Sequence, residues 1–318
     1  MKNEKISIII PVFNEEENIK LLFEKLYKVL NKISYNFEII AINDGSTDNS
    51  EKILDKSVKI YKNLKIVNFK RNFGQTAAMM AGFDHSTGDI IIPIDADLQN
   101  DPNDIPKLIK KLEEGYDVVS GWRKNRKDSA IKRKFLSKVA NWLISIVAGL
   151  KLHDYGCTLK AYRKSSILDV KLYGEMHRFI PIYSHLTGAK VTEIPVQHHP
   201  RIHGKSKYGI DRILKALLDL IVIRFLSQYF KKPIYLFGGI AFILLTASGC
   251  SLFLALYLKF FKSIYLIKTP LPLFSAMTFI TGIMCILMGI LAEIIMRTYF
   301  ESQNKKSYSE KNIIESKK

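Results

Sequence analysis

The first 120 residues alternate between short apolar runs and segments whose apolar residues recur at helical spacing. Short apolar runs bounded by turn residues are typical of buried strands, and a three-to-four spacing is typical of amphipathic helices. The predicted strands cover residues 6–11, 37–43, 64–69, 90–94 and 117–120. The predicted helices cover residues 17–30, 50–61, 75–84 and 105–114. Strands separated by helices predict an α/β domain with a mainly parallel, Rossmann-like sheet covered on both faces.

Two long uncharged stretches follow this domain. No charged residue occurs from position 233 to 258 or from 269 to 292. Each stretch exceeds the roughly 20 apolar residues that cross the hydrocarbon core of a bilayer. The alternative is a pair of buried core helices, but these seldom stay uncharged over such a length. The pattern therefore predicts two transmembrane helices that form a hairpin over residues 233–296.

The basic residues around the hairpin predict its orientation. Lys231 and Lys232 precede the first stretch, and the short connection carries only lysines 259, 262 and 268. The basic residues after the second stretch are Arg297, Lys305, Lys306, Lys311, Lys317 and Lys318. Because basic flanks stay on the cytoplasmic side, both ends of the hairpin are predicted on the cytoplasmic side of a plasma (inner) membrane. We expect a cytoplasmic domain over 1–230, the hairpin, and a basic cytoplasmic tail over 297–318.

Two further stretches, at about 130–150 and 210–230, are amphipathic and carry basic residues. Helices of this kind can lie in the headgroup layer of a membrane. In the first stretch the basic residues cluster at its beginning, as Lys132, Arg133, Lys134 and Lys138. Ordinary helices packed on the sheet are the alternative for both.

The 318-residue chain has a formal net charge of +18. Such an excess favours a polyanionic partner, and nucleic acid, an anionic membrane and phosphorylated substrates all qualify. We find no recognisable nucleic-acid-binding module and predict no nucleic-acid partner. The three cysteines form no paired pattern, so reduced thiols are expected. The N-terminus has no long apolar segment with a cleavage site, which is consistent with a domain that stays in the cytoplasm.

Unusual polar residues follow three of the predicted strands, in segments 11–15, 43–48 and 95–99. Each has a simple structural alternative, since Asn14 and Asp48 could be helix N-caps and Asp44-Gly45 a plain turn. Parallel strands bring their carboxyl ends to one edge of the sheet, where α/β proteins bind ligands. The three segments together therefore predict a binding site at that edge.

Asp95 and Asp97 carry the most direct chemistry. In an extended segment the side chains of residues i and i+2 point the same way, so the two carboxylates can face the same position. Two carboxylates in close proximity repel each other unless a cation lies between them. Mg²⁺ or Mn²⁺ commonly binds one or two carboxylates and completes its shell with water and substrate phosphates. Gln99 continues the same alternation and could add a neutral oxygen. A surface turn with two unused acids is the alternative.

Seven strings, in this order, resemble a known family: PVFNEEENI, NDGSTDNS, FKRNFGQTAA, DADLQNDP, DYGCTLKAYRK, GEMHRFIP and PRIHGKSKYG. The chain resembles the polyprenyl-phosphate glycosyltransferases, the dolichyl-phosphate-mannose-synthase-like branch of glycosyltransferase family 2, through most of residues 5–230. That resemblance implies a GT-A fold. Two spans after the catalytic domain resemble the bacterial members that use undecaprenyl phosphate.

The resemblance also implies roles for individual residues. The nucleoside would be held by Pro11, Phe13, Glu15, Ile42 and Asp44. The metal would be bound by Asp95, Asp97 and Gln99, with Ala96 against the nucleotide. Phosphate contacts would come from Arg123, Arg201 and Lys207. The family often has Tyr where Phe13 stands and Asp where Asn43 stands, which puts a hydroxyl hydrogen bond at residue 13 in doubt.

A lipid-phosphate acceptor simplifies the expected reaction. A phosphate monoester has a second pKa near 6 and is largely dianionic at neutral pH, so its oxygen can attack the anomeric carbon without a strong base. Asp154 could be a base, but we expect it to orient the acceptor or bind the sugar. His177 and Arg178 are expected in a loop near the acceptor or sugar, with a Glu175–Arg178 ion pair as the alternative. A single displacement inverts the anomeric centre, as the resemblance also implies.

The sequence leaves the donor open. UDP-glucose is the first expectation, with GDP-mannose, a UDP-N-acetylhexosamine and a UDP-4-amino-pentose as alternatives. A processive polysaccharide synthase would carry a Gln-x-x-Arg-Trp signature and more spans, and the chain has neither. A non-enzymatic basic membrane protein and a catalytically dead relative are the remaining alternatives, and the intact acid pair argues against both. A homo-oligomer stays open.

Overall fold

The computed structural model describes residues 4–124, 145, 149–167, 176–200, 225 and 232–302. The chain divides into two compact units, Met1–Leu220 and Ile221–Lys318, and each is described separately. The basic cluster at 132–138, most of both amphipathic stretches, Glu175, Arg201, Lys207 and the tail beyond 302 lie outside the described residues.

The first unit contains a seven-stranded sheet with the strand order β3-β2-β1-β4-β6-β5-β7. Its strands are β1 (Lys5–Val12), β2 (Asn36–Asn43), β3 (Leu64–Asn68), β4 (Ile90–Pro93), β5 (Val118–Trp122), β6 (Lys160–Arg163) and β7 (Val191–Pro195). All neighbouring pairs are parallel except those of β6, which runs antiparallel to β4 and to β5. The predicted mainly parallel α/β sheet is therefore confirmed, with all five predicted strands in it.

Helices follow the first four strands, as the spacing of apolar residues predicts. They are α1 (Ile19–Leu30), α2 (Ser50–Ile60), α3 (Gln75–His85) and α4 (Ile105–Glu113), with α6 (Ile180–Leu186) before β7. Short 3₁₀ turns occupy Pro102–Asp104, Lys164–Ser166 and Met176–Phe179.

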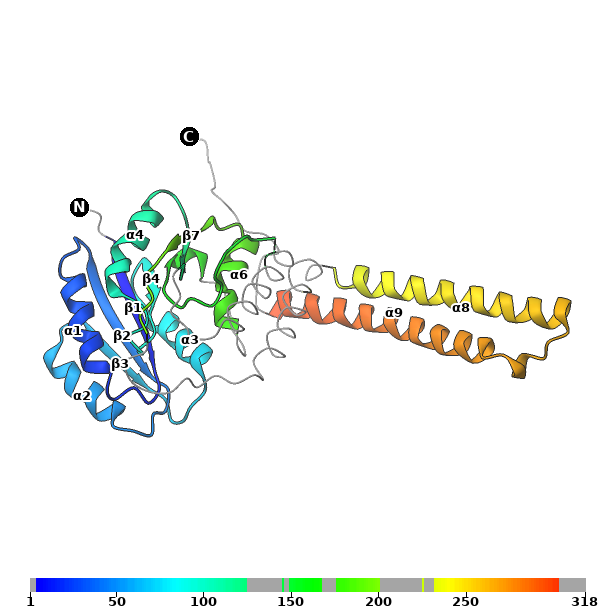
Figure 1. Ribbon diagram of the computed structural model, residues 1–318, viewed down its shortest axis with the longest axis horizontal. Coiled ribbons are helices and arrows are strands. Elements are labelled where there is room, and N and C mark those ends of the chain that lie inside the picture. The colour runs from blue at the N-terminus through cyan, green and yellow to red at the C-terminus, as the bar shows by residue number, and fades with distance from the viewer. Residues whose placement is uncertain are drawn as a thin grey trace. The chain divides into compact units, whose positions relative to one another are not determined.

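Helices cover both faces of the sheet (Figure 1), and a separate hydrophobic cluster lies under the helices on each face. Alternate residues of β1 show this division, because Ile8 and Ile10 belong to the cluster under α1, α2 and α4, whereas Ile9 belongs to the cluster under α3 and α6. Gly82 lets α3 approach β1 closely: a Cβ there would lie 2.3 Å from the Ile9 side chain. The buried strands thus read as continuous apolar runs because both of their faces are covered.

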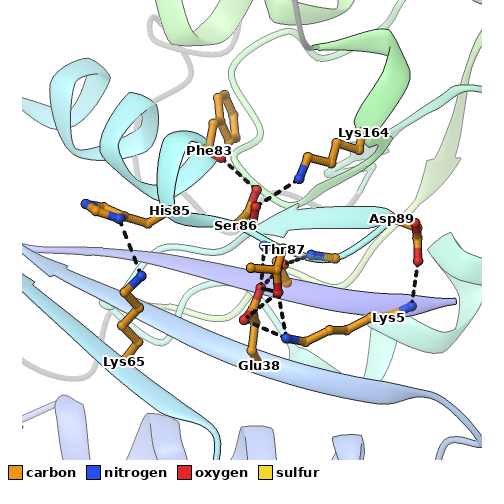
Figure 2. A network of polar contacts seen from close by, with 11 residues as sticks. Lys5, Glu38, Lys65, Phe83, His85, Ser86, Thr87, Asp89 and Lys164 are labelled. Carbon is orange, nitrogen blue, oxygen red and sulfur yellow. Dashed lines mark hydrogen bonds and ion pairs between the residues drawn. The ribbon is translucent and has the colours of Figure 1, made fainter.

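A polar network holds the amino-terminal edge of the sheet together (Figure 2). The Glu38 carboxylate of β2 accepts from Lys5 Nζ at 2.8 Å, from Ser7 Oγ at 2.6 Å and from the Thr87 backbone N–H at 2.7 Å. The Lys5 backbone N–H donates to Asp89 at 2.9 Å. Burial opposes the charge on Glu38, but these hydrogen bonds outweigh it and lower the pKa of Glu38 to about 2. This network lies at the edge opposite the predicted binding site.

The second unit contains two long apolar helices, α8 (Ile234–Lys262) and α9 (Leu271–Ser302), joined through a 3₁₀ turn at Leu266–Lys268. Both are long and apolar enough to cross a membrane. The helices pack side by side (Figure 1) through small residues seven positions apart. These are Ala241, Ser248 and Ala255 on α8, and Ser275, Gly282 and Gly289 on α9, and all six are buried.

Two serines join the helices at the middle of this contact. Ser248 Oγ donates to the Ser275 carbonyl at 2.9 Å, and Ser275 Oγ donates to the Ser248 carbonyl at 3.0 Å. Small residues let helix backbones approach closely where lipid provides no hydrophobic drive between helices, and hydroxyls add hydrogen bonds across the contact. The large apolar side chains, in contrast, are mostly exposed. A helical hairpin with this pattern is suited to a lipid environment.

Candidate functional site

The predicted site segments gather at one edge of the sheet. Segment 13–18 follows β1, 44–49 follows β2 and 94–101 follows β4, all at the carboxyl ends of parallel strands. Arg123 follows β5 at the same edge. The 154–159 segment reaches this edge from the opposite direction, because it precedes the antiparallel strand β6. The topology therefore brings five separate stretches of sequence to one place.

The loops after β1 and β2 are joined by hydrogen bonds. The Asn14 side chain accepts from the Thr47 backbone N–H at 2.8 Å, and the Asn14 N–H donates to Ser46 Oγ at 3.0 Å. Asn14 lies in the left-handed region with φ 52°, a conformation that asparagine tolerates better than most residues. Asp48 accepts from the Glu16 N–H at 3.2 Å. The helix N-caps are Asn18 and Asn49, so Asn14 connects the two loops and is not an N-cap. Asp48 connects the loops and also accepts from the Ser50 N–H, the first of α2, at 2.9 Å.

The residues expected to hold the nucleoside surround these joined loops. Pro11 and Ile42 lie opposite each other in the β1–β2 register, and Ile42 is fully buried. Glu15 is fixed by a hydrogen bond from its backbone N–H to Ser50 Oγ at 2.9 Å, and its side chain accepts from Asn18 at 2.7 Å. Phe13, which lies between Pro11 and Glu15 in the sequence, is partly exposed. The structure brings these residues together, and their contact with a nucleoside stays a prediction.

Asp44 anchors the loop after β3. Its carboxylate accepts from the backbone N–H groups of Phe73 at 2.7 Å and Gly74 at 3.0 Å, and from the Asn72 side chain at 2.9 Å. Burial raises the pKa of Asp44 in spite of these hydrogen bonds. Gly45 next to it has φ +64°, and a Cβ there would collide with the Arg71 backbone at 2.3 Å. The predicted nucleoside acid therefore also fixes the segment that leads into α3.

The two acids of the predicted metal site interact strongly. Burial, together with the negative charge of Asp97, raises the pKa of Asp95 to about 6. Asp97 is only 7% exposed. Asp95 is partly buried and Asp97 is buried, and two carboxylates that oppose each other's ionisation are stabilised as a pair by a divalent cation. No three acidic, histidine or cysteine side chains gather into a metal-binding group among the described residues. The pair fits Mg²⁺ or Mn²⁺ that takes its remaining ligands from water and a substrate diphosphate, and the assignment of Asp95 and Asp97 as its ligands stays a prediction.

The backbone of this motif differs from the expected extended segment. Strand β4 ends at Pro93, residues 96 and 97 form a turn, and Leu98 has φ 61°. The turn is closed by the Gln99 N–H, which donates to Asp97 at 3.2 Å. The alternation on which the Gln99 prediction rested therefore does not reach Gln99, whose role as a ligand stays a prediction. Ala96 is buried within the turn.

Arg123 and Asp154 form a two-pronged ion pair. Arg123 Nε and Nη2 donate to the two Asp154 carboxylate oxygens at 2.6 and 2.9 Å. Burial opposes ionisation of Asp154, but the hydrogen bond and charge of Arg123 outweigh it and lower the pKa of Asp154. The same pair raises the pKa of Arg123. A carboxylate that is held ionised in this way is a weak base, which supports the expectation that Asp154 orients other groups.

The residues next to this pair also face each other. The Trp122 and His153 rings stack at 4.3 Å between centroids, and His153 hydrogen-bonds Glu193 of β7. Gly156 lies against the guanidinium, since a Cβ there would be 3.2 Å from Arg123 Nη2. The end of β5 and the 153–156 turn are therefore joined by both a ring stack and an ion pair.

Two residues near the acids, one buried and one partly buried, were not singled out from the sequence. Lys160 of β6 is 2% exposed and donates to the carbonyls of Tyr155, at 3.1 Å, and of Cys157. Burial lowers the pKa of Lys160 to about 8. Gln75, the first residue of α3, donates from Nε2 to Asp95 Oδ1 at 2.8 Å. The only sequence signal for either was its presence in the strings FGQTAA and DYGCTLK, because a lysine or glutamine usually marks a solvent-exposed position.

His177 is buried against the start of α3. Its Nδ1 lies 2.7 Å from Thr76 Oγ1, and burial lowers the pKa of His177 to about 3. The ring is therefore neutral near pH 7. Glu175 lies outside the described residues, so the alternative ion pair with Arg178 stays a prediction.

The segment before the predicted phosphate clamp lies against the metal motif. Asn100 and His198 form an antiparallel bridge, and the His199 N–H donates to the Gln99 carbonyl at 2.9 Å. His199 also contacts Asp101 at 3.0 Å. The chain therefore reaches Pro200, the residue before Arg201, directly beside residues 99–101.

Comparison with known proteins agrees with this geometry. The family model described as glycosyl transferase family 2 matches residues 7–170. Dodecaprenyl-phosphate galacturonate synthase of Rhizobium johnstonii is 40% identical over 98% of this chain and 93% of its own length. Undecaprenyl-phosphate 4-deoxy-4-formamido-L-arabinose transferase of Proteus mirabilis is 35% identical over 100% of this chain and 96% of its own length.

Solved structures show a similar fold. Glucosyl-3-phosphoglycerate synthase of Mycobacterium tuberculosis, in complex with Mn²⁺, UDP and phosphoglyceric acid, has a TM-score of 0.53 and covers 70% of this chain and 78% of its own. The complex of the same enzyme with Mn²⁺, UDP-glucose and glycerol 3-phosphate has a TM-score of 0.52. At 16% identity the likeness concerns the fold alone. The expected GT-A-like architecture is confirmed.

Proposed function

We propose that this chain, which belongs to glycosyltransferase family 2, transfers a sugar from a nucleoside diphosphate to the phosphate of a polyprenyl lipid. The observation that carries the proposal is the acid pair Asp95 and Asp97 directly after β4, at the carboxyl edge of the sheet, in a chain whose second unit is a membrane-type hairpin. The two full-length relatives are both named for transfer to a polyprenyl phosphate. The acid pair supplies a diphosphate site, and the hairpin supplies access to a lipid.

The reaction needs no strong base from the protein. An oxygen of the acceptor phosphate forms a bond to the anomeric carbon, while the bond from that carbon to the diphosphate breaks and the nucleoside diphosphate leaves. The acceptor is largely dianionic at neutral pH, so no proton has to be removed first. This agrees with an Asp154 whose carboxylate is held ionised by Arg123. We infer inversion at the anomeric centre from this single displacement.

The residues of the site divide the remaining work. Asp95 and Asp97 would hold a divalent cation, which when bound neutralises charge on the departing diphosphate. Arg123 donates to Asp154 from Nε and Nη2. Because the guanidinium is planar, this pairing also fixes the direction of its other N–H groups. We assign these groups to the donor phosphates. The joined loops after β1 and β2 would hold the nucleoside, and Arg201 and Lys207 would complete the phosphate contacts.

The names of the relatives change the preferred donor. Neither is named for glucose, the sugar expected first from the sequence. We therefore favour a UDP-linked uronic acid or a UDP-linked pentose with nitrogen at C4, the second of which was already an alternative. The catalytic domain is assigned to the cytoplasmic face of the inner membrane, from the basic flanks of the hairpin.

A donor panel tests the proposal. The purified full chain in lipid nanodiscs is incubated with undecaprenyl phosphate, Mg²⁺ and, separately, UDP-galacturonate, UDP-glucuronate, UDP-4-amino-4-deoxy-L-arabinose, its formamido form, UDP-glucose and GDP-mannose. We expect one donor to give a lipid-phosphate sugar by mass spectrometry. Asp97→Asn is the control and should lower the yield at least about 100-fold while it stays folded. Transfer in the absence of lipid phosphate, or equal transfer by Asp97→Asn, would contradict the proposal.

A further inference from the structure

Asp95 is held by a residue that lies far from it in the sequence. Gln75 Nε2, at the start of α3, donates to Asp95 Oδ1 at 2.8 Å. An ionised carboxylate only accepts hydrogen bonds, so a neutral amide donor is suited to fix its orientation.

The start of α3 is itself fixed by the nucleoside side of the site. Asp44 accepts from the Gly74 N–H at 3.0 Å, and Gly74 precedes Gln75 with a φ of +94° that favours glycine. A continuous set of contacts therefore runs from Asp44 through Gly74 and Gln75 to Asp95. The loop that would hold the nucleoside and the acid that would hold the cation are positioned by one rigid helix start.

The orientation of the Gln75 amide follows from its partner. If the amide were flipped, its oxygen would face the ionised carboxylate at hydrogen-bond distance, and the two would repel. The Nε2 donor occupies a lone pair of Oδ1 and limits rotation of the Asp95 carboxyl group. Metal-binding carboxylates are commonly oriented by such outer hydrogen bonds, and their removal costs 10–100-fold in metal affinity or activity.

We propose that Gln75 is a positioning residue that orients Asp95 for the divalent cation. This inference rests on the proposed metal-assisted transfer and adds one residue to it. Gln75 acts through Asp95 and is not itself a ligand. Loss of its donor should weaken cation binding while leaving the fold and the remaining site intact.

The structure supplies matched variants. Gln75→Leu and Gln75→Met both remove the donor at similar size. Thr76→Val is the control, because Thr76 is the neighbour of Gln75 on α3 and its hydroxyl contacts His177 at 2.7 Å. Thermal unfolding of each variant checks the fold, and Gln75→Met keeps the test valid if Gln75→Leu is unstable.

The direct readout is Mn²⁺ affinity of the full chain in nanodiscs with UDP present, followed by the electron paramagnetic resonance signal of free Mn²⁺. Gln75→Leu and Gln75→Met should bind Mn²⁺ about 10–100-fold more weakly than wild type. Thr76→Val should bind like wild type. In transfer assays the Mg²⁺ concentration for half-maximal rate should rise by the same factor, and saturating Mg²⁺ should restore the rate. A merely structural defect would not be restored by metal.

Two failures can be told apart. If wild type binds Mn²⁺ with UDP and Gln75→Leu and Gln75→Met bind it equally well, the positioning role is overturned and the metal site stands. If wild type with UDP binds no Mn²⁺, the metal assignment of the proposed function fails and the positioning role fails with it.

Discussion

At the scale of single residues, the pairing of Arg123 with Asp154 determines what Asp154 can do. Both side chains are nearly buried, at 13% and 11% exposed, and they share two hydrogen bonds. Breaking one member of a buried pair leaves an uncompensated charge and costs about 3–5 kcal/mol of stability. Removing both members at similar volume is far less costly.

We predict that Asp154→Leu and Arg123→Met each lower the free energy of unfolding by about 3 kcal/mol, and that the double variant loses much less than the sum. Chemical denaturation of the four proteins measures the coupling. Strictly additive losses would show that the pair is not coupled.

The pH–rate profile of wild type should show no ionisation of Asp154 near neutral pH, because its pKa lies below its ordinary value.

Glu38 gives a pH-dependent prediction about stability. Its pKa falls from an ordinary 4.5 to about 2 in the folded state. A lowered carboxyl pKa adds stability that is complete above the unfolded pKa and is lost as the pH falls toward the folded pKa. Glu38→Gln should therefore be roughly 2–3 kcal/mol less stable than wild type at pH 7, and the gap should close between about pH 5 and pH 2.

Denaturation midpoints measured from pH 7 to pH 3 test this. The control is Glu24→Gln, at an exposed position of α1. A gap for Glu38→Gln that stays constant over this range would mean that the network in Figure 2 does not depend on the charge of Glu38.

At the scale of elements, the hairpin depends on small residues between α8 and α9. A Cβ at Gly282 would lie 2.9 Å from Leu245, whereas a Cβ at Gly238 on α8 would meet nothing within 4 Å. Gly282→Leu should force the helices apart and cost about 1–3 kcal/mol, as overpacking does. Gly238→Leu is the matched control and should have little effect. Thermal unfolding in detergent compares them, and equal melting temperatures would contradict the packing.

The elements show which parts of the fold follow from local pattern. The buried parallel strands and the hairpin were predictable, because long apolar runs identify them. Strands β6 and β7 were not. β6 is four residues long and begins with the buried Lys160, and β7 is only partly buried. Both depend on tertiary pairing with β5, which no local pattern reveals.

The candidate site divides in the same way. Asp95, Asp97 and Asp44 stood out in the sequence because they lie in polar segments that follow predicted strands, whereas Arg123 came only from the family resemblance. The structure places all four at one edge of the sheet, and their roles stay predictions. The turn at residues 96–98 was not predictable, since the left-handed Leu98 has no sequence signature. Gln75 looks like an ordinary polar surface residue, and only its three-dimensional contact with Asp95 distinguishes it.

At the scale of the whole molecule, we expect the two units to have separable functions. The sheet unit holds the proposed nucleotide and metal residues, and the hairpin unit holds the spans. A chain ending at residue 232 should still bind UDP, but its turnover on undecaprenyl phosphate in vesicles should fall at least about 10-fold. Calorimetry and a vesicle assay measure the two tasks. Equal turnover would show that the spans are dispensable for reaching the acceptor.

The position of the cation tests the central claim most directly. Full-length protein with UDP and Mn²⁺, studied by anomalous diffraction at the manganese edge, should show one ion between the Asp95 and Asp97 carboxylates and the diphosphate. The same data from Asp97→Asn should show that ion lost or strongly reduced. A manganese peak elsewhere, or UDP bound away from the carboxyl edge of β1, β2 and β4, would contradict the account.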